Sequence, residues 1–116
     1  MRIPREGQLL RIFVGESDRW KGHPLFEAIV QEARRQGLAG ATVFRGFEGF
    51  GANSRIHTSR ILRLSEDLPI LIEIVDAEEK IQSFLPVLDG MVQEGLVTIE
   101  KATVIFYRAS EPPAET

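Results

Sequence analysis

The feature that most constrains the fold of this chain is the order in which strand-like and helix-like patterns follow one another. Segments of alternating polarity and segments with helical apolar spacing appear in the order β-α-β, β-α-β. The halves echo each other weakly, because Gly37-Leu38 precedes Ala41-Thr42-Val43 and Gly95-Leu96 precedes Ala102-Thr103-Val104. A split βαβ repeat predicts a ferredoxin-like α+β sandwich, βαββαβ, in which two helices cover one face of a four-stranded antiparallel sheet.

The first half of the pattern predicts a strand, a helix and a second strand. Residues 8–15 alternate as a strand, and Pro24 suits the first turn of a helix. Gly37 is expected to end that helix as a left-handed C-cap. The second strand is expected over 42–50, where Gly46, Gly49 and Gly51 indicate a bulge or a close backbone approach.

The second half begins with the strongest strand pattern of the chain, residues 68–75. Asp76 and Glu79 predict a capping box of the D-x-x-E type before the second helix. Pro86 is expected to kink that helix, and Gly95 to end it. Two extended pieces follow, 96–99 and 102–107, with 100–101 as a bend or a continuation. The long connection, 51–67, is placed between the second and third strands.

Length and composition predict one domain, residues 1–108, followed by a tail, 109–116, that is disordered by composition. The chain contains no cysteine, which excludes disulfides and thiolate metal sites and permits a cytoplasmic location. No apolar run reaches the length of a membrane span, and we expect a cytoplasmic protein. The net charge of −3 disfavours nucleic acid as a partner.

The sheet face that the helices leave uncovered is predicted to be partly apolar. In the third strand, Leu71 and Val75 fall on that face beside Glu73. Large apolar side chains left in water usually mark an interface. We therefore expect association of copies through the sheet, although a few scattered apolar residues are also normal on a protein surface.

A basic, glycine-jointed stretch is the main candidate site. From Arg45 to Arg63 there are four arginines and one acid, Glu48, a local charge of +3 that leaves −6 for the remaining residues. Arginines and bare glycine backbone suit a small anion. The candidate ligands are Arg55, His57 and Arg60. A solvated arginine face and a surface or capping role for His57 are the alternative interpretations.

Other motifs are weaker. The glycine spacing G-x-x-G-x-G differs from the dinucleotide fingerprint and leads into a polar loop rather than a helix. Arg45-Gly46-Phe47 resembles the start of an RNA-binding signature, but Glu48 breaks it and the strand is the wrong one. The sequence shows no catalytic triad, nucleophile elbow or metal signature, so it predicts neither an enzyme nor a metal site.

The run 37–51, Gly-Leu-Ala-Gly-Ala-Thr-Val-Phe-Arg-Gly-Phe-Glu-Gly-Phe-Gly, and the run 54–76 resemble a family of PII-like signalling proteins, distant relatives of nitrogen-regulatory PII proteins. The resemblance covers about residues 8–107. It implies a ferredoxin-like homotrimer with its sheets facing inward and adenine nucleotides bound in clefts between subunits. Lining residues implied by the resemblance are Thr42, Gly49, Phe50, Gly51 and Ile72, with Gly95 near the start of the phosphate-binding turn.

The chain departs from PII proteins where they carry the run Thr-Gly-Lys-Ile-Gly-Asp-Gly-Lys. Here residues 94–101 read Glu-Gly-Leu-Val-Thr-Ile-Glu-Lys, with one glycine and with leucine in place of the first lysine. Little of that phosphate cradle is therefore reproduced. We hypothesise that the cluster of Arg55, His57 and Arg60, with Lys101 or Arg108 of a neighbouring subunit, contacts the anion instead.

The leading hypothesis is a non-catalytic sensor without an obligatory cofactor. An adenine nucleotide or another small anion would order the 51–64 loop and change which partner protein the trimer engages. A membrane transporter is the partner that family analogy suggests. The alternatives are a small enzyme with His57 as acid or base, an RNA-binding protein, and a purely structural trimer or a CutA-like metal-associated protein.

Overall fold

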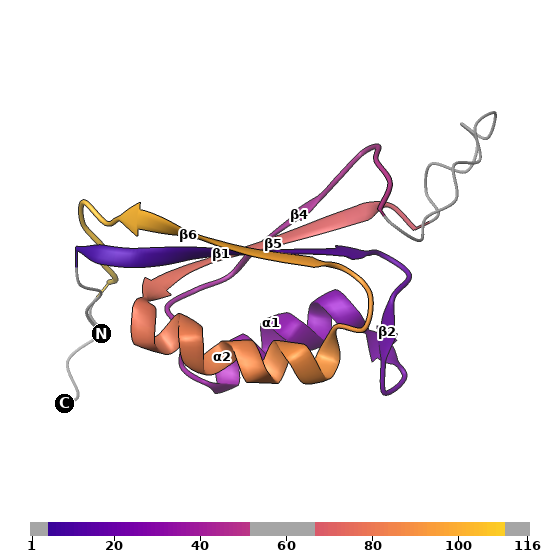
Figure 1. The fold of residues 1–116 in the computed structure, drawn as a ribbon, viewed down its shortest axis with the longest axis horizontal. Helices are drawn as coiled ribbons and strands as arrows, with labels where there is room; N and C mark the ends of the chain where they lie inside the picture. Colours follow the sequence, from indigo (N-terminus) through magenta and orange to yellow (C-terminus); the bar gives the residue numbers. More distant parts are fainter. Residues whose placement is uncertain (1–4, 52–66, 111–116) are drawn as a thin grey trace.

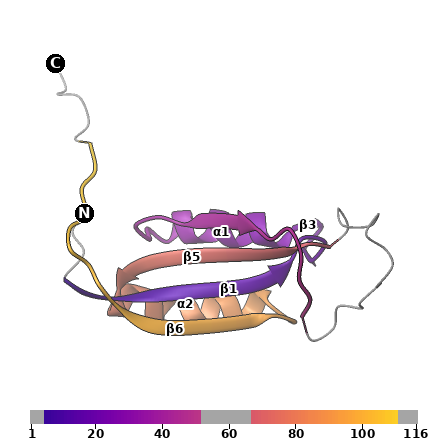
Figure 2. The ribbon, with the colours of Figure 1, turned by 90° about the horizontal axis from the view of Figure 1, so that it is seen from above.

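The computed structural model describes residues 5–51 and 67–110 of the chain. It confirms the predicted α+β architecture: a four-stranded antiparallel sheet in the order β4-β5-β1-β6, with both helices on one face (Figures 1 and 2). The main elements are β1 (Glu6–Gly15), α1 (Leu25–Arg35), β4 (Thr42–Arg45), β5 (Pro69–Ala77), α2 (Glu78–Met91) and β6 (Leu96–Thr103). Neither helix of this described part is both long and apolar enough to traverse a membrane.

The two central strands, β1 and β5, carry the core. They pair in one register from Gly7 opposite Ala77 to Gly15 opposite Pro69. Strict alternation sends every second side chain toward the helices, as expected for a sheet covered on one face. The strand residues buried in this way are Leu10, Ile12, Val14, Ile70, Ile72 and Ile74.

Helix α1 ends as its sequence predicts, whereas Pro24, expected in its first turn, lies just before it in β3. Pro24 precedes its first residue, and Leu25, Ile29 and Ala33 are buried at intervals of four residues. At the carboxyl end Gly37 has φ +80°, and the amide of Leu38 donates to the carbonyl of Ala33. The amide of Gly37 donates to the carbonyl of Arg34, which completes a Schellman motif and confirms the left-handed C-cap.

The capping box predicted for α2 is wrong. Asp76 belongs to β5, faces inward with the buried isoleucines, and is only 1% exposed. Its carboxylate accepts hydrogen bonds from the amides of Ala39 (2.9 Å) and Ala77 (2.6 Å), and it gives α2 no side-chain cap. Asp76 thus ties the turn after α1 to the end of β5. Helix α2 continues through Pro86 and ends at Met91, before Gly95.

Two strand predictions also need correction. Strand β4 ends at Arg45 rather than Phe50; the amide of Gly46 makes one more bond, to the carbonyl of Pro69 (2.7 Å). The predicted close approach is confirmed at Gly46, where a Cβ would lie 2.6 Å from the Pro69 ring. Strand β6 runs without a bend to Thr103, so residues 104–107 do not extend it as a strand.

A small hairpin was not predicted. Strands β2 (Arg19–Trp20) and β3 (His23–Pro24) pair beside the start of α1 (Figure 1). The turn residues Lys21 (φ 49°) and Gly22 (φ 84°) both have positive φ, as a type I′ turn requires. The ammonium of Lys21 lies 4.6 Å from the centre of the Trp20 ring. The lysine-glycine pair was the sequence signal for this turn.

Candidate functional site

The outer face of the sheet, turned away from the helices, carries an apolar row that crosses all four strands. The registers place Phe44 of β4, Leu71 of β5, Phe13 of β1 and Leu96 of β6 in one line. Phe44 is 47% exposed and Leu96 is 55% exposed. The predicted apolar character of this face is therefore present, and we call these four residues the apolar row.

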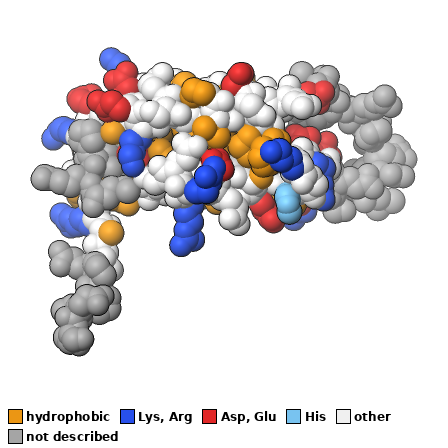
Figure 3. All heavy atoms as spheres, turned by 90° about the horizontal axis from the view of Figure 1, so that it is seen from below, with side chains coloured by type: hydrophobic (Ala, Val, Ile, Leu, Met, Phe, Trp, Pro, Cys, Tyr) orange, Lys and Arg blue, Asp and Glu red, His pale blue; other side chains and the backbone are white. Residues whose placement is uncertain are grey.

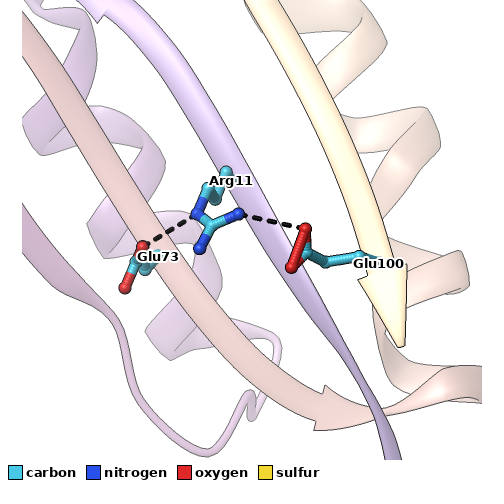
Figure 4. A network of polar contacts seen from close by, with 3 residues as sticks. All are labelled: Arg11, Glu73 and Glu100. Carbon is cyan, nitrogen blue, oxygen red and sulfur yellow. Dashed lines mark hydrogen bonds and ion pairs between the residues drawn. The ribbon is translucent and has the colours of Figure 1, made fainter. Parts of the chain in front are cut away.

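A charged network joins the strands β5, β1 and β6 on the same face (Figure 4). Arg11 of β1 donates from Nε to Glu73 of β5 (2.9 Å) and from Nη1 to Glu100 of β6 (3.2 Å). These carboxylates raise the pKa of Arg11 above its ordinary value, the hydrogen bond to Glu73 contributing most. Sequence alternation separates Arg11 and Glu73 from the core side of their strands, but it does not show that they meet Glu100, because only the strand register brings the three together.

The glycine-rich segment 46–51 continues from β4 at one end of the sheet. Phe47 and Phe50 are among its most exposed side chains. Arg45, the first arginine of the basic stretch, pairs with Glu16 at 3.0 Å. At this position the positive charge is therefore balanced by an acid of the same chain.

The structure does not bring the predicted site residues together within one chain. Gly49, Phe50 and Gly51 follow β4, whereas Gly95 precedes β6 at the opposite edge of the sheet. Three strand spacings separate those edges, roughly 14 Å. Lys101 and Arg108 lie toward the other end of the sheet, where Lys101 pairs with Gln8. Arg55, His57 and Arg60 lie outside the described residues.

Individual side chains differ in their availability. Thr42 stands on the outer face opposite Glu73 and is exposed. Ile72 is 0% exposed in the core, which leaves only its backbone for contact with a ligand. Lys101 pairs with Gln8, on the same side of the sheet as Leu10, and therefore points to the helix side. The guanidinium of Arg108 lies over the Phe106 ring at 4.1 Å.

Gly95 has a structural explanation of its own. A Cβ at this position would lie 2.6 Å from the carbonyl oxygen of Phe13 and 3.1 Å from Val92. The close approach of β1 therefore explains why a glycine stands in this turn, and no bound phosphate is needed to explain it.

A shallow pocket of about 290 Å³ lies between the hairpin and the end of α2. No sequence motif pointed to it. It is lined by Ser17, Asp18, Arg19, Leu25, Met91, Gln93 and Glu94.

On the helix face, acidic and basic side chains are interspersed around an apolar strip (Figure 3). Within residues 5–51 and 67–110, no three of His, Asp and Glu gather closely enough to hold a metal ion.

Residues 7–104 match the model of DUF190, a family described as "Uncharacterized ACR, COG1993". This chain belongs to the DUF190 family. Relatives that bear the name UPF0166 protein include the following two. One from Aquifex aeolicus (strain VF5) is 39% identical over 106 residues, covering 91% of this chain and 99% of the relative. The one from Methanocaldococcus jannaschii, MJ1524, is 36% identical over 95 residues, covering 81% and 87%.

Solved structures share the fold of this DUF190 chain. TTHA0516 of Thermus thermophilus, described as a PII-like signalling protein, has a TM-score of 0.62 at 21% identity, with 90% of this chain and 94% of that chain covered. CPII of Thiomonas intermedia K12, a nitrogen-regulatory PII-like protein bound to ADP and bicarbonate, has a TM-score of 0.56 at 18% identity, covering 85% and 88%. The predicted PII-like fold is confirmed.

Proposed function

We propose that this DUF190 chain is a non-catalytic, PII-like regulator that binds a small anionic effector, an adenine nucleotide, between the subunits of a homotrimer. The effector changes which partner protein the trimer engages. The shared fold supports this proposal, as do the structures of CPII bound to ADP, AMP, bicarbonate and acetate, all of them anions.

The observation that carries the proposal is the apolar row on the outer face. Burying a large apolar side chain contributes about 1.5–3 kcal/mol, so a row across four strands favours contact with another protein surface over water. Association also resolves the separation of the candidate residues. Gly49, Phe50 and Gly51 lie at one end of the sheet and Lys101 and Arg108 at the other. Only residues from different copies could meet around one ligand.

Isothermal titration calorimetry with ATP, ADP and AMP tests the proposal. Bicarbonate is titrated in two further experiments, once alone and once together with nucleotide. We expect saturable binding that weakens about tenfold or more in Lys101→Ala, since a charged hydrogen bond contributes roughly 1.5–3 kcal/mol. Lys21→Ala, in the hairpin over Trp20, is the matched control and should bind as the wild type does. Absence of heat with every ligand at millimolar concentration would contradict an anionic effector of this class.

The rival functions gain no support from the described residues. The enzyme hypothesis depends on His57, which lies outside them. Mixed charge on the helix face and a net charge of −3 do not favour a nucleic-acid backbone. A membrane transporter as partner is an extension of the family resemblance. It is tested by co-purification from solubilised membranes with and without nucleotide, where a nucleotide-dependent difference in the captured transporter is expected.

A further inference from the structure

The pocket between the β2–β3 hairpin and the end of α2 is formed within one chain, whereas the proposed nucleotide site needs residues from different copies (Figure 1). Its volume of about 290 Å³ lies at the lower limit of ligand pockets, roughly 300–1,000 Å³, and suits a small metabolite. Two of its lining residues belong to the core: Leu25 is 2% exposed and Met91 is 4% exposed. The pocket therefore offers an apolar surface to the carbon atoms of a ligand.

One wall of the pocket follows β1 and is held in place by hydrogen bonds. The carboxylate of Asp18 accepts from the amide of Gly15 (2.9 Å), and its carbonyl accepts from the amide of Leu25 (2.8 Å). The guanidinium of Arg19 donates from Nη2 to the carbonyl of Gly22 (2.8 Å). These charged groups are thus positioned before a ligand arrives, which lowers the entropic cost of binding one.

The other wall is the turn after α2, which contributes Gln93 and Glu94. This turn is held against β1, because a Cβ at Gly95 would lie only 2.6 Å from the carbonyl oxygen of Phe13. The two walls come from segments that are far apart in the sequence, so the pocket exists only in the folded chain.

The lining combines both signs of charge. Asp18 and Glu94 carry carboxylates and Arg19 a guanidinium, which sum to −1. In the part of the chain that the structure describes, no ion pair joins Arg19 to either acid. A guanidinium has five N–H donors, and the contact described for Arg19 uses one nitrogen, Nη2. A ligand that supplies a carboxylate for the guanidinium and ammonium groups for the acids complements all three side chains.

We propose that this pocket binds an α-amino acid with a cationic side chain. Its carboxylate pairs with Arg19, its ammonium groups pair with Asp18 and Glu94, and its aliphatic carbons contact Leu25 and Met91. The charge of +1 on such a ligand matches the −1 of the lining. The inference goes beyond the proposed function, because it gives each subunit a second effector site that requires neither a nucleotide nor a neighbouring copy.

Isothermal titration calorimetry with three related probes tests the ligand class. L-lysine carries every group that the pocket complements, cadaverine lacks the carboxylate, and L-norleucine lacks the side-chain ammonium. L-lysine should bind saturably, and each of the other two should bind about tenfold or more weakly, because each loses a charged contact.

Variants of the lining test the place of binding. Glu94→Gln should weaken L-lysine binding about tenfold or more. Glu79→Gln is the matched control, because it changes the net charge equally in the first turn of α2, at the other end of the helix, and it should bind as the wild type does. Arg19→Met keeps an aliphatic stem. It should weaken the binding of L-lysine but not that of cadaverine, which has no carboxylate, and circular dichroism checks that each variant folds.

Three results would overturn the inference. They are no saturable heat with L-lysine at millimolar concentration, cadaverine or L-norleucine binding the wild type as tightly as L-lysine, and equal affinities of Glu94→Gln and Glu79→Gln for L-lysine. The nucleotide titrations are independent of these. Binding of L-lysine without binding of ADP would leave this inference standing while the proposed function fails, and the reverse result would overturn this inference alone.

Discussion

At the scale of single residues, a substitution at Gly95 tests whether this glycine is needed for packing or for binding a ligand. Because Gly95 has no side chain, the carbonyl oxygen of Phe13 can lie very close to it; a Cβ atom at this position would be only 2.6 Å from that oxygen. Gly95→Ala should therefore lower the free energy of unfolding by about 1–3 kcal/mol, measured by urea denaturation, with or without nucleotide present.

Gly90 in helix α2 is the matched control for Gly95. A Cβ there would meet no heavy atom within 4 Å. Gly90→Ala is expected to stabilise the chain by about 0.5–1 kcal/mol, because alanine is the better helix former. A Gly95→Ala protein as stable as the wild type, but deficient in nucleotide binding, would instead assign this glycine to the ligand.

Asp76 provides a second test at the residue scale. Its carboxylate satisfies the amides of Ala39 and Ala77 from a position that is almost completely buried. Asp76→Ala should lower the free energy of unfolding by about 1–3 kcal/mol, because the amides lose their acceptor. The amide of Ala39 should exchange with deuterium faster than in the wild type. Unchanged exchange at Ala39 would contradict the tie between the α1–β4 turn and β5.

These residues also show where sequence reasoning succeeds and fails. Gly37 was predicted correctly because a glycine after a helical pattern acts locally, through φ and the last helix carbonyls. Asp76 was misassigned because an acid before a helix has the same pattern whether it caps that helix or faces inward from a strand. Which of these two roles Asp76 has depends on its hydrogen bond with the amide of Ala39, which is 37 residues away in the sequence.

At the scale of elements, helix α1 should be sensitive to acid. The side chains of Gln36 and then Arg35 hydrogen-bond to Glu32 and hold its pKa below the ordinary value. Because the pKa of Glu32 is lower in the folded state than its ordinary value of 4.5, the ionised carboxylate stabilises the fold at pH values above 4.5. This stabilisation is lost as the pH falls through the folded-state pKa. Glu32→Gln should flatten the fall of the urea midpoint between pH 6 and pH 3.5.

Glu27→Gln is the control for helix α1, since Glu27 lies in the first turn of the same helix and is exposed. It should retain the acid sensitivity of the wild type. An equally steep loss of stability in Glu32→Gln would contradict the assignment to Glu32.

Element order was predictable, whereas element length was not. The alternation in β1 and β5 is strong because these strands are central and buried on one face, so their residues are constrained. Strand β4 is an edge strand with four exposed residues, and its apolar sequence through Phe50 looked like a longer strand. The β2–β3 hairpin escaped prediction because two-residue strands carry no periodicity, and only its turn residues gave a signal.

At the scale of the whole molecule, neighbouring residues of β4 offer a test of the outer face. Phe44 lies in the apolar row, and Val43 points to the helix side; both are partly exposed. Phe44→Glu should abolish or weaken self-association by about tenfold or more, because a charge enters the contact. The molar mass is measured by light scattering on a size-exclusion column, and folding is checked by circular dichroism.

Val43→Glu is the control, because it adds the same charge to the same strand on the opposite face. It should keep the association of the wild type. Equal molar masses for the two variants and the wild type would contradict an interface on the outer face.

The sequence predicts the candidate site only in part, because the site depends on how the whole molecule, and its copies, bring distant residues together. Sequence proximity grouped Gly49, Phe50 and Gly51, and the family resemblance added Gly95. Lys101 was added as a hypothesis, because the chain lacks most of the family's phosphate cradle. The strand order places these groups at different edges and ends of one sheet. Whether they form a site depends on how copies meet, and that geometry is not encoded in any local pattern.

The edge position of β4 has a consequence for local unfolding. This strand is held by a single ladder of four residue pairs to β5, and all four of its residues are exposed, whereas β1 is paired on both sides. Its amides should open in brief excursions that leave the rest of the sheet intact, and proteases should cut there first. In an isolated copy β4 is thus the least protected strand of the sheet, and covering Phe44 with a second copy would slow those openings.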